Sequence, residues 1–201
     1  MERKSDLPQN PPETAEVQAR EEVMAIILHG IACGREVGKS HARGLGLPCD
    51  LTLRAMTDYF AMPDGRRIAF RHAAKADGAT TIVFLPGYMS DMAGSKATAL
   101  FDWAQENGHA CLLLDYSGCG ESDGDFADGT LSLWRDEVLA LIEAKLDGPV
   151  LLVGSSMGGW LMLLAGLALG ERLAGMVGIA AAPDFSDWGY SAEQKASLQA
   201  G

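Results

Sequence analysis

The stretch that decides the fold is Val150-Leu-Leu-Val-Gly-Ser-Ser156-Met-Gly-Gly-Trp-Leu-Met-Leu-Leu-Ala-Gly-Leu-Ala-Leu169. It begins with a short apolar run, passes through a turn of glycine and serine, and continues as a longer apolar run that stops near Gly170. A short apolar run bounded by turn residues is typical of a buried strand, and the longer run is typical of a helix that is covered on all sides. The stretch therefore predicts a strand over Val150–Val153, a tight turn, and a helix over Met157–Leu169.

The flanking sequence continues the same alternation. The expected elements are strands over Thr57–Ala61, Arg67–His72 and Thr81–Leu85, a helix over Ser95–Glu106, a strand over Ala110–Leu114, a helix over Leu131–Leu146 and a strand over Met176–Ala180. Asp64-Gly65 predicts a hairpin between the first two strands, and the capping box Ser191–Gln194 predicts a last helix. Apolar strands that alternate with helices indicate an α/β fold with a doubly wound, mostly parallel sheet.

The turn in the central stretch carries the strongest chemical signal. Gly154-Ser155-Ser156-Met157-Gly158 matches GxSxG, and it lies between a strand and a helix, which is the context that this motif requires. Gly154 and Gly158 allow strand and helix to approach closely, and the strained turn exposes the hydroxyl of the middle serine. The sequence therefore predicts Ser156 as a catalytic nucleophile, whereas Ser155 occupies a structural position.

Acyl transfer needs N–H donors for the oxygen of the tetrahedral intermediate. In this kind of fold one donor follows the nucleophile and the other lies in the loop after an earlier strand. These positions are Met157 and Tyr88, and Gly87 allows the chain to aim the second N–H toward the site. We therefore expect an oxyanion hole formed by Tyr88 and Met157. The alternative is that Pro86-Gly87 is an ordinary surface turn.

A second glycine-rich loop, Asp115–Gly124, follows the next strand, and we expect it to support the site without supplying a catalytic acid. The general base is harder to find, since a serine nucleophile needs a histidine and the chain order in this fold is Ser, Asp or Glu, then His. All four histidines precede Ser156. Asp184 and Asp187 come before the last two strands of a complete sheet, so we expect them to be loop or helix-cap residues. The catalytic Asp and His are thus expected to be absent from this chain.

The order of these segments also predicts the domain organisation. We expect residues 1–55 to be a poorly ordered extension, and residues 56–201 to form the nucleophile half of an α/β domain that lacks its last strands. Such a chain is a truncated reading frame or a natural short form that binds without catalysing. Within the extension, Cys33–Ser40 is one substitution from a phosphate-binding loop, but it lacks a following helix, so we expect no nucleotide there.

Composition excludes several functions. The chain has 201 residues and a formal net charge of −11, which argues against nucleic acid as a partner. The four cysteines show no metal-ligand spacing, so no metal is expected. The apolar run Val23–Cys33 is too short to span a membrane and is preceded by Glu21 and Glu22, which argues against an export signal. We therefore expect a cytoplasmic protein without a membrane span.

Four motifs between Met56 and Tyr190 carry a resemblance to a known family. They are Pro86-Gly-Tyr88, Asp115-Tyr-Ser-Gly-Cys-Gly120, Trp134-Arg-Asp-Glu-Val138 and Gly148-Pro-Val-Leu-Leu-Val-Gly-Ser-Ser-Met-Gly-Gly-Trp-Leu-Met162. Together they resemble the α/β-hydrolase superfamily, and within it the mitochondrial palmitoyl-protein thioesterases, which also hydrolyse acyl glucuronides, and their bacterial relatives.

The resemblance implies a serine-dependent depalmitoylase or carboxylesterase with Ser156 as nucleophile and no metal or organic cofactor. Its substrate would be a small acyl ester or thioester, or an acylated protein, and a mitochondrial location becomes the alternative to the cytoplasm. A second hypothesis stays open, in which the chain is a non-catalytic binding module with a hydrolase-like fold. An Asp and a His encoded downstream would decide for the hydrolase.

Overall fold

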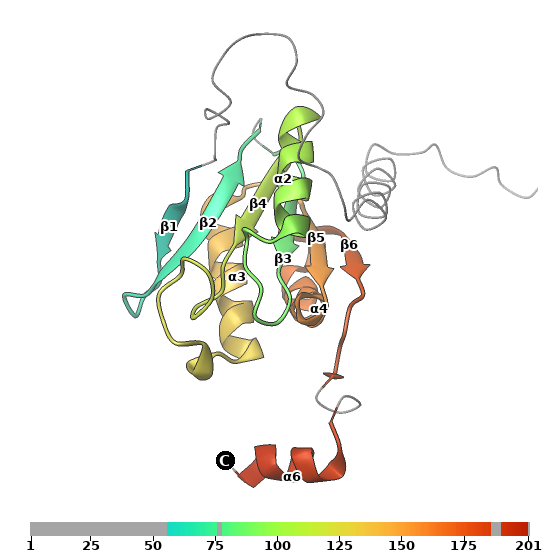
Figure 1. Cartoon of the computed structure of the whole chain (residues 1–201). Coiled ribbons are helices and arrows are strands. Elements are labelled where there is room, and N and C mark those ends of the chain that lie inside the picture. The colour runs from blue at the N-terminus through green and yellow to red at the C-terminus, as the bar shows by residue number, and fades with distance from the viewer. Residues whose placement is uncertain (1–55, 76–77, 186–189, 201) are drawn as a thin grey trace, which may run out of the picture.

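The computed structural model describes residues 56–75, 78–185 and 190–200, and the side chains of residues 198–200 are outside the description. The described chain forms a six-stranded sheet with helices on both sides (Figure 1). The strands are β1 (Asp58–Ala61), β2 (Arg67–Ala73), β3 (Thr81–Leu85), β4 (Ala110–Leu114), β5 (Val150–Ser155) and β6 (Leu173–Ile179). The helices are α2 (Ser95–Glu106), α3 (Leu131–Lys145), α4 (Met157–Leu169) and α6 (Ala192–Ala200), with short 3-10 turns η1 (Phe126–Asp128) and η2 (Gly170–Arg172).

The sheet has the order β1-β2-β4-β3-β5-β6. β1 and β2 form the expected hairpin, and β2 pairs antiparallel with β4. The remaining pairs, β4 with β3, β3 with β5 and β5 with β6, are parallel. The predicted α/β class with a mostly parallel sheet is therefore confirmed, and the carboxyl ends of β3, β4, β5 and β6 meet at one end of the molecule.

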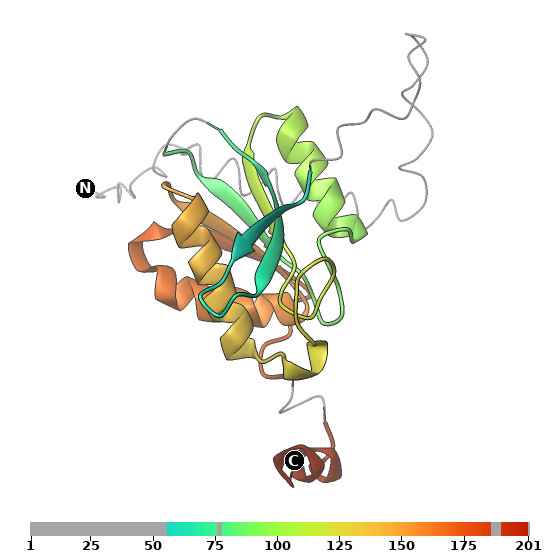
Figure 2. The ribbon, with the colours of Figure 1, turned by 90° about the vertical axis from the view of Figure 1, so that its left-hand side faces the viewer.

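Two apolar cores cover the two faces of the sheet, because alternate side chains of each strand point to opposite faces. On one face α3 and α4 pack on Leu112, Leu152 and their neighbours. On the other face α2 packs on Ile82, Leu113 and Val153. Figure 2 shows α2 on one side of the sheet and both α3 and α4 on the other. Strands β3, β4 and β5 are buried along their whole length, which explains their continuous apolar sequence.

The helix boundaries follow local signals. The Thr130 side chain accepts a hydrogen bond from the N–H of Leu133 and caps α3. At α6 the N–H of Ser191 donates to the Gln194 side chain, and the N–H of Gln194 donates to the Ser191 hydroxyl, so the predicted capping box forms. Five strand boundaries differ from the prediction: β1 begins at Asp58, β2 ends at Ala73, β5 continues to Ser155, and β6 begins at Leu173 and ends at Ile179.

Several sequence-based expectations lie outside the described residues. They concern the extension over residues 1–55 and, within it, the phosphate-loop match Cys33–Ser40. Among the helices that the structure describes, none has the length and apolar character needed to cross a membrane.

Candidate active site

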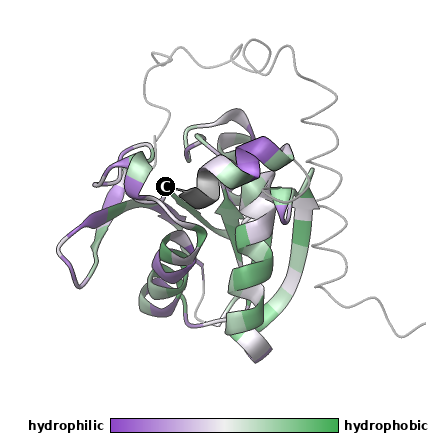
Figure 3. Ribbon diagram, turned by 90° about the horizontal axis from the view of Figure 1, so that it is seen from below, coloured by the Kyte–Doolittle hydropathy of each residue, from purple (hydrophilic) through white to green (hydrophobic). Residues whose placement is uncertain are grey.

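Ser156 stands between β5 and α4, where the chain passes from strand to helix. Its backbone has φ 54° and ψ −120°, a conformation that a serine rarely adopts. Such strain costs roughly 1–3 kcal/mol and persists only where the surrounding structure imposes it. The residues on either side, Ser155 and Met157, are buried, whereas Ser156 is exposed. The turn therefore presents the side chain of Ser156 to solvent at the carboxyl end of the sheet, the end seen in Figure 3.

Two glycines make this turn possible. A Cβ on Gly154 would lie 2.4 Å from the carbonyl oxygen of Gly158, and a Cβ on Gly158 would lie 2.1 Å from the carbonyl oxygen of Leu85. Both distances are far inside van der Waals contact, and the two oxygens are backbone atoms that have little freedom to move. Neither position therefore accepts a side chain, and the first turn of α4 rests directly on the end of β3.

Hydrogen bonds fix the backbone of Ser156 on both sides. Its N–H donates to the carbonyl oxygen of Ile179, the last residue of β6, at 3.0 Å. Its carbonyl oxygen accepts from the N–H of Gly159 at 2.9 Å and from the N–H of Ala182 at 3.0 Å. The strained conformation is thus held between the end of β6 and the start of α4.

The turn after β3 lies directly beside Ser156. A Cβ on Gly87 would lie 3.1 Å from the carbonyl oxygen of Ser155 and 3.3 Å from the Ser156 Cβ, so the two turns are packed closely against each other. The N–H of Ser90 donates to the carbonyl oxygen of Gly87 at 3.1 Å, which closes a four-residue turn with Tyr88 and Met89 at its centre. The backbone of Tyr88 therefore follows a residue that adjoins Ser156.

The loop after β4 anchors both ends of the β3 loop. Tyr116 is fully buried and donates its hydroxyl to the carbonyl oxygen of Pro86 at 3.1 Å. The Asp115 carboxylate accepts from the N–H of Met92 at 2.7 Å and from the N–H of Glu121 at 2.9 Å. Burial raises the pKa of Asp115, and these two hydrogen bonds offset part of the effect. Asp115 is engaged in holding loops together, in keeping with the supporting role expected of this segment.

Glu137 of α3 binds the same loop through a hydrogen bond to its backbone. Its side chain is completely buried and accepts from the guanidinium of Arg66 and from the N–H of Ser117, the latter at 3.0 Å. This role of Glu137 was not predicted from the sequence, because a glutamate in an amphipathic helix ordinarily faces solvent. Its position between Trp134 and Val138 on the buried side of the helical pattern was the available signal.

Neither histidine in the described residues lies beside Ser156. His109 precedes β4 and stacks on Trp103. Since β4 and β5 both pair in parallel with β3, His109 is level with the start of β5, about 20 Å from Ser156 at roughly 3.3 Å per residue. His72 pairs with Leu112 in the middle of β4, so that β4 and β3 separate it from β5. The structure does not bring an imidazole of this part of the chain to the serine.

The remaining candidates for the catalytic acid and base are not placed beside Ser156 either, or lie outside the described residues. Asp184 follows β6, is exposed and has a backbone φ of 53°, as suits a loop residue. Asp187, His29 and His41 lie outside the described residues. The residues that the structure does gather at Ser156 are therefore the predicted serine turn and the β3 turn.

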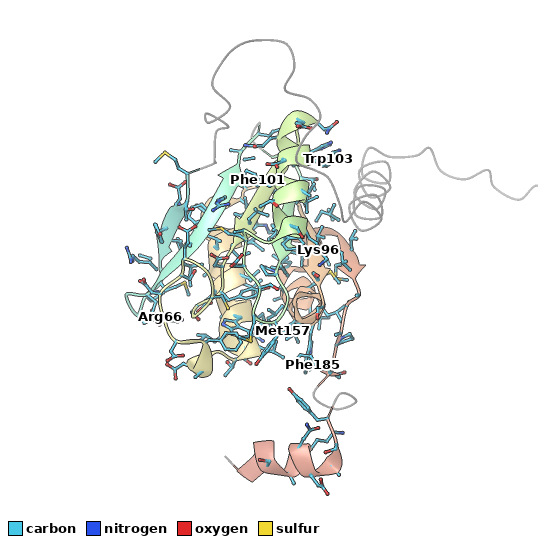
Figure 4. The ribbon with its side chains drawn as sticks, viewed as in Figure 1. Arg66, Lys96, Phe101, Trp103, Met157 and Phe185 are labelled. Carbon is cyan, nitrogen blue, oxygen red and sulfur yellow. The ribbon has the colours of Figure 1, made fainter. Side chains whose placement is uncertain are left out.

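Aromatic side chains surround this end of the sheet. Tyr88 packs edge-on against Phe126 with ring centroids 5.2 Å apart. Phe185 packs edge-on against Trp160 of α4 at 5.6 Å, and next to Tyr190 at 6.3 Å. Figure 4 shows Phe185 at the same end of the molecule as Met157. The Phe185 contacts were not predicted from the sequence, because they join residues that only the tertiary structure brings together.

Cysteines and acidic residues in the described part of the chain show no arrangement for a metal. Within the described ranges, no group of three or more His, Cys, Asp or Glu side chains is placed to hold an ion. Cys111 and Cys119 are buried free thiols, and burial raises their pKa to about 12 and about 11. Both thiols are thus protonated at neutral pH and poor nucleophiles. The expectation that the protein uses no cofactor stays a prediction.

Comparison with known proteins agrees with this geometry. Residues 82–200 match the sequence model of the alpha/beta hydrolase family. Human "Palmitoyl-protein thioesterase ABHD10, mitochondrial" is 46% identical over 123 residues, which are 61% of this chain and 39% of that protein. The chain therefore spans about two fifths of the length of this relative.

Two solved structures are similar over a larger share of the chain. Mouse alpha/beta hydrolase domain-containing protein 10 aligns with a TM-score of 0.65 at 35% identity, covering 73% of this chain and 59% of that one. A hydrolase structure from Agrobacterium vitis S4 aligns with a TM-score of 0.63 at 37% identity, covering 72% of this chain and 60% of that one. The resemblance inferred from the motifs is confirmed, and the chain belongs to the alpha/beta hydrolase family.

Proposed function

We propose that this protein is a serine hydrolase of carboxylic esters or acyl thioesters and that Ser156 is its nucleophile. The observation that carries the proposal is the strained turn that exposes Ser156 between two buried neighbours, with φ 54°. A backbone held in this conformation by the surrounding structure is typical of functional sites. A buried strand before it and a buried helix after it match the context of the GxSxG motif.

The oxyanion hole that we propose uses the N–H groups of Tyr88 and Met157. The N–H groups in the first turn of a helix lack intrahelical partners, and the helix dipole adds a partial positive charge there. Met157 is the first residue of α4, and the contact of Gly87 with Ser156 supports a second donor from Tyr88. Two such donors stabilise the charge that develops on the carbonyl oxygen when the serine attacks.

In the proposed reaction the Oγ of Ser156 attacks the carbonyl carbon of the substrate and its proton passes to a base. The tetrahedral intermediate then collapses, the bond from carbon to the leaving oxygen or sulfur breaks, and the base returns the proton to the leaving group. Water then attacks the carbonyl carbon of the acyl-serine while the base takes its proton. The bond from that carbon to the Ser156 Oγ breaks, the base returns the proton to Oγ, and a carboxylic acid leaves. Every step is proton transfer and acyl transfer, so the proposal includes no metal and no organic cofactor.

The relatives suggest the substrate class. The human relative is named a palmitoyl-protein thioesterase, which favours an acyl thioester, including one on a protein, as the substrate here. The same relatives are named mitochondrial, which supports the mitochondrial alternative to our expectation of a cytoplasmic protein. We propose no nucleic acid as a partner, because the net charge of −11 repels phosphate.

A second candidate function is a binding module without catalysis. It is favoured by the distance of His72 and His109 from Ser156, since a serine hydroxyl without a base is almost wholly protonated at neutral pH. An oxyanion hole alone gives only about 10³ to 10⁴ over water. We therefore expect the 201-residue chain by itself to show no turnover above background.

Added imidazole tests the proposal, because it supplies in solution the base that we expect this chain to lack. The protein is incubated with the butanoyl thioester of N-acetylcysteamine, with and without imidazole, and acyl-enzyme is followed by intact-protein mass spectrometry. We expect imidazole to accelerate the acylation, and we expect peptide mapping to locate the acyl group on Ser156. Ser156→Ala should abolish this adduct, whereas Ser155→Ala should retain it.

A chimera provides the second arm of the test. The part of the Agrobacterium vitis hydrolase that this chain does not span is joined after β6, so that the chimera gains whatever acid and base that relative carries. We expect turnover of the thioester that Ser156→Ala removes. A well-folded chimera without turnover, together with no adduct on Ser156 in the first arm, would favour the binding module.

A further inference from the structure

The tip of the turn after β3 displays two large apolar side chains to solvent. Tyr88 is 55% exposed and Met89 is 73% exposed. Neighbouring side chains of this size would each gain free energy from burial, so their display is unfavourable for an isolated fold. The tip adjoins Ser156 through Gly87. An exposed apolar surface therefore begins within two residues of the contact with the serine turn.

The backbone of the same tip is strained. Met89 has φ 52°, a region that glycine occupies freely and that methionine enters at a cost of roughly 1–2 kcal/mol. A turn closed by the Ser90 N–H on Gly87 with a positive φ at its third residue ordinarily has glycine there. The fold would thus be served as well or better by glycine, and the methionine side chain itself needs another explanation.

Both ends of the loop are fixed, which lets the tip keep this conformation. The Tyr116 hydroxyl holds Pro86 on one side, and the Asp115 carboxylate holds Met92 on the other. Phe126 supports the ring of Tyr88 edge-on. The tip is therefore a preorganised apolar surface, and a ligand that binds it meets side chains already in place.

We propose that Met89, together with Tyr88, contacts the acyl chain of the substrate and determines which chain lengths react. This inference rests on the proposed function, because the acyl chain is attached to the carbonyl carbon that Ser156 attacks. A carbonyl oxygen on the Tyr88 N–H places that carbon next to the tip. Of the two substituents on the carbon, the hydrocarbon chain is the one that gains from apolar contact, since the leaving group of a protein thioester is polar peptide.

Chain-length selectivity tests this assignment. Wild type and Met89→Gly are acylated, with imidazole present, by the butanoyl and octanoyl thioesters of N-acetylcysteamine, which share one leaving group. Glycine suits φ 52°, so the variant should fold at least as well as wild type. We expect the octanoyl rate to fall roughly tenfold, the effect of losing contact with one or two methylene groups, and the butanoyl rate to change less than twofold.

The matched control is Leu167→Ala, which removes an exposed apolar side chain from α4, at 84% exposure against 73% for Met89. It should leave the ratio of octanoyl to butanoyl rates unchanged. Equal losses for both thioesters in Met89→Gly would overturn the inference while the proposed function stands. A change that follows the leaving group, seen when octanoyl oxyesters of different alcohols are compared, would also overturn it.

A binding measurement separates the inference from the proposed function. In the Ser156→Ala background, which forms no adduct, affinities for the S-butyl and S-octyl thioethers of N-acetylcysteamine are measured by titration calorimetry. We expect Met89→Gly to weaken the S-octyl compound roughly tenfold and to spare the S-butyl compound. If wild type forms no acyl-serine but this difference is found, only the proposed function fails, and if affinities are equal the inference fails.

Discussion

The loops after β3 and β4 lie at the same end of the sheet but differ in almost every physical respect. The β4 loop keeps Asp115, Tyr116 and Ser117 buried. The side chains of Asp115 and Tyr116 bond to backbone groups of neighbouring loops, and the backbone of Ser117 bonds to the side chains of Glu137 and Trp134. The β3 turn displays Tyr88 and Met89. Residues of the β4 loop anchor the β3 loop at both ends, whereas the tip between those anchors contributes little to the core. The β4 loop therefore provides the rigidity with which the β3 turn holds a strained, exposed surface.

The largest loss of stability is expected from a substitution where the β4 loop is anchored to α3. Glu137→Ala removes a fully buried side chain and leaves the Ser117 N–H without its acceptor, while Arg66 keeps its ion pair with Asp64. We expect the free energy of unfolding to fall by about 2–4 kcal/mol, measured by urea denaturation.

The control for this prediction is Glu143→Ala, which removes an exposed partner of Arg172 and should cost less than about 1 kcal/mol. If the two variants were equally stable, the idea that the β4 loop is the rigid half of the pair would be wrong.

A smaller loss of stability, together with slower acylation of Ser156, is expected from a substitution where the two loops meet. Tyr116→Phe deletes the hydroxyl that donates to Pro86 and keeps the buried ring, so stability should fall by about 1 kcal/mol. Because the β3 turn loses an anchor, we expect imidazole-assisted acylation of Ser156 to slow for butanoyl and octanoyl thioesters alike. Tyr59→Phe, at an exposed position on β1, should change neither property. Unchanged acylation in Tyr116→Phe would show that the turn holds its shape without this bond.

The smallest change in stability is expected at His72, which lies outside both loops. Burial lowers the pKa of His72, and the neighbouring Lys145 lowers it further. As the pH falls below about 6.5, the unfolded chain binds a proton that the folded chain resists, so stability declines toward acid pH. His72→Gln should reduce the difference between urea midpoints at pH 7.5 and 5.5, and should leave acylation at pH 7.5 unchanged. An equal pH difference in both proteins would contradict the lowered pKa.

The prediction of elements succeeded where the signal was local. The bounds of α2 and α4 match the sequence prediction, because the glycine or asparagine that ends each helix stands beside an apolar pattern of the right period. The ends of β5 and β6 were misplaced by two or three residues. Gly154 and Ser155 belong to β5 because they pair with Gly178 and Ile179 of β6, and no pattern within β5 reveals that partner.

The sequence by itself determined the α/β class, the strand-turn-helix context of Ser156 and the need for glycine at positions 154 and 158. These properties depend on periodicity, on turn residues and on the steric demand of one tight turn, all of which are written in neighbouring positions. Only the tertiary structure decided that Asp115 and Tyr116 hold the β3 loop, that Glu137 is buried, and that Met89 is strained and exposed. These depend on contacts between segments far apart in the chain, where burial and hydrogen-bond partners are set by packing.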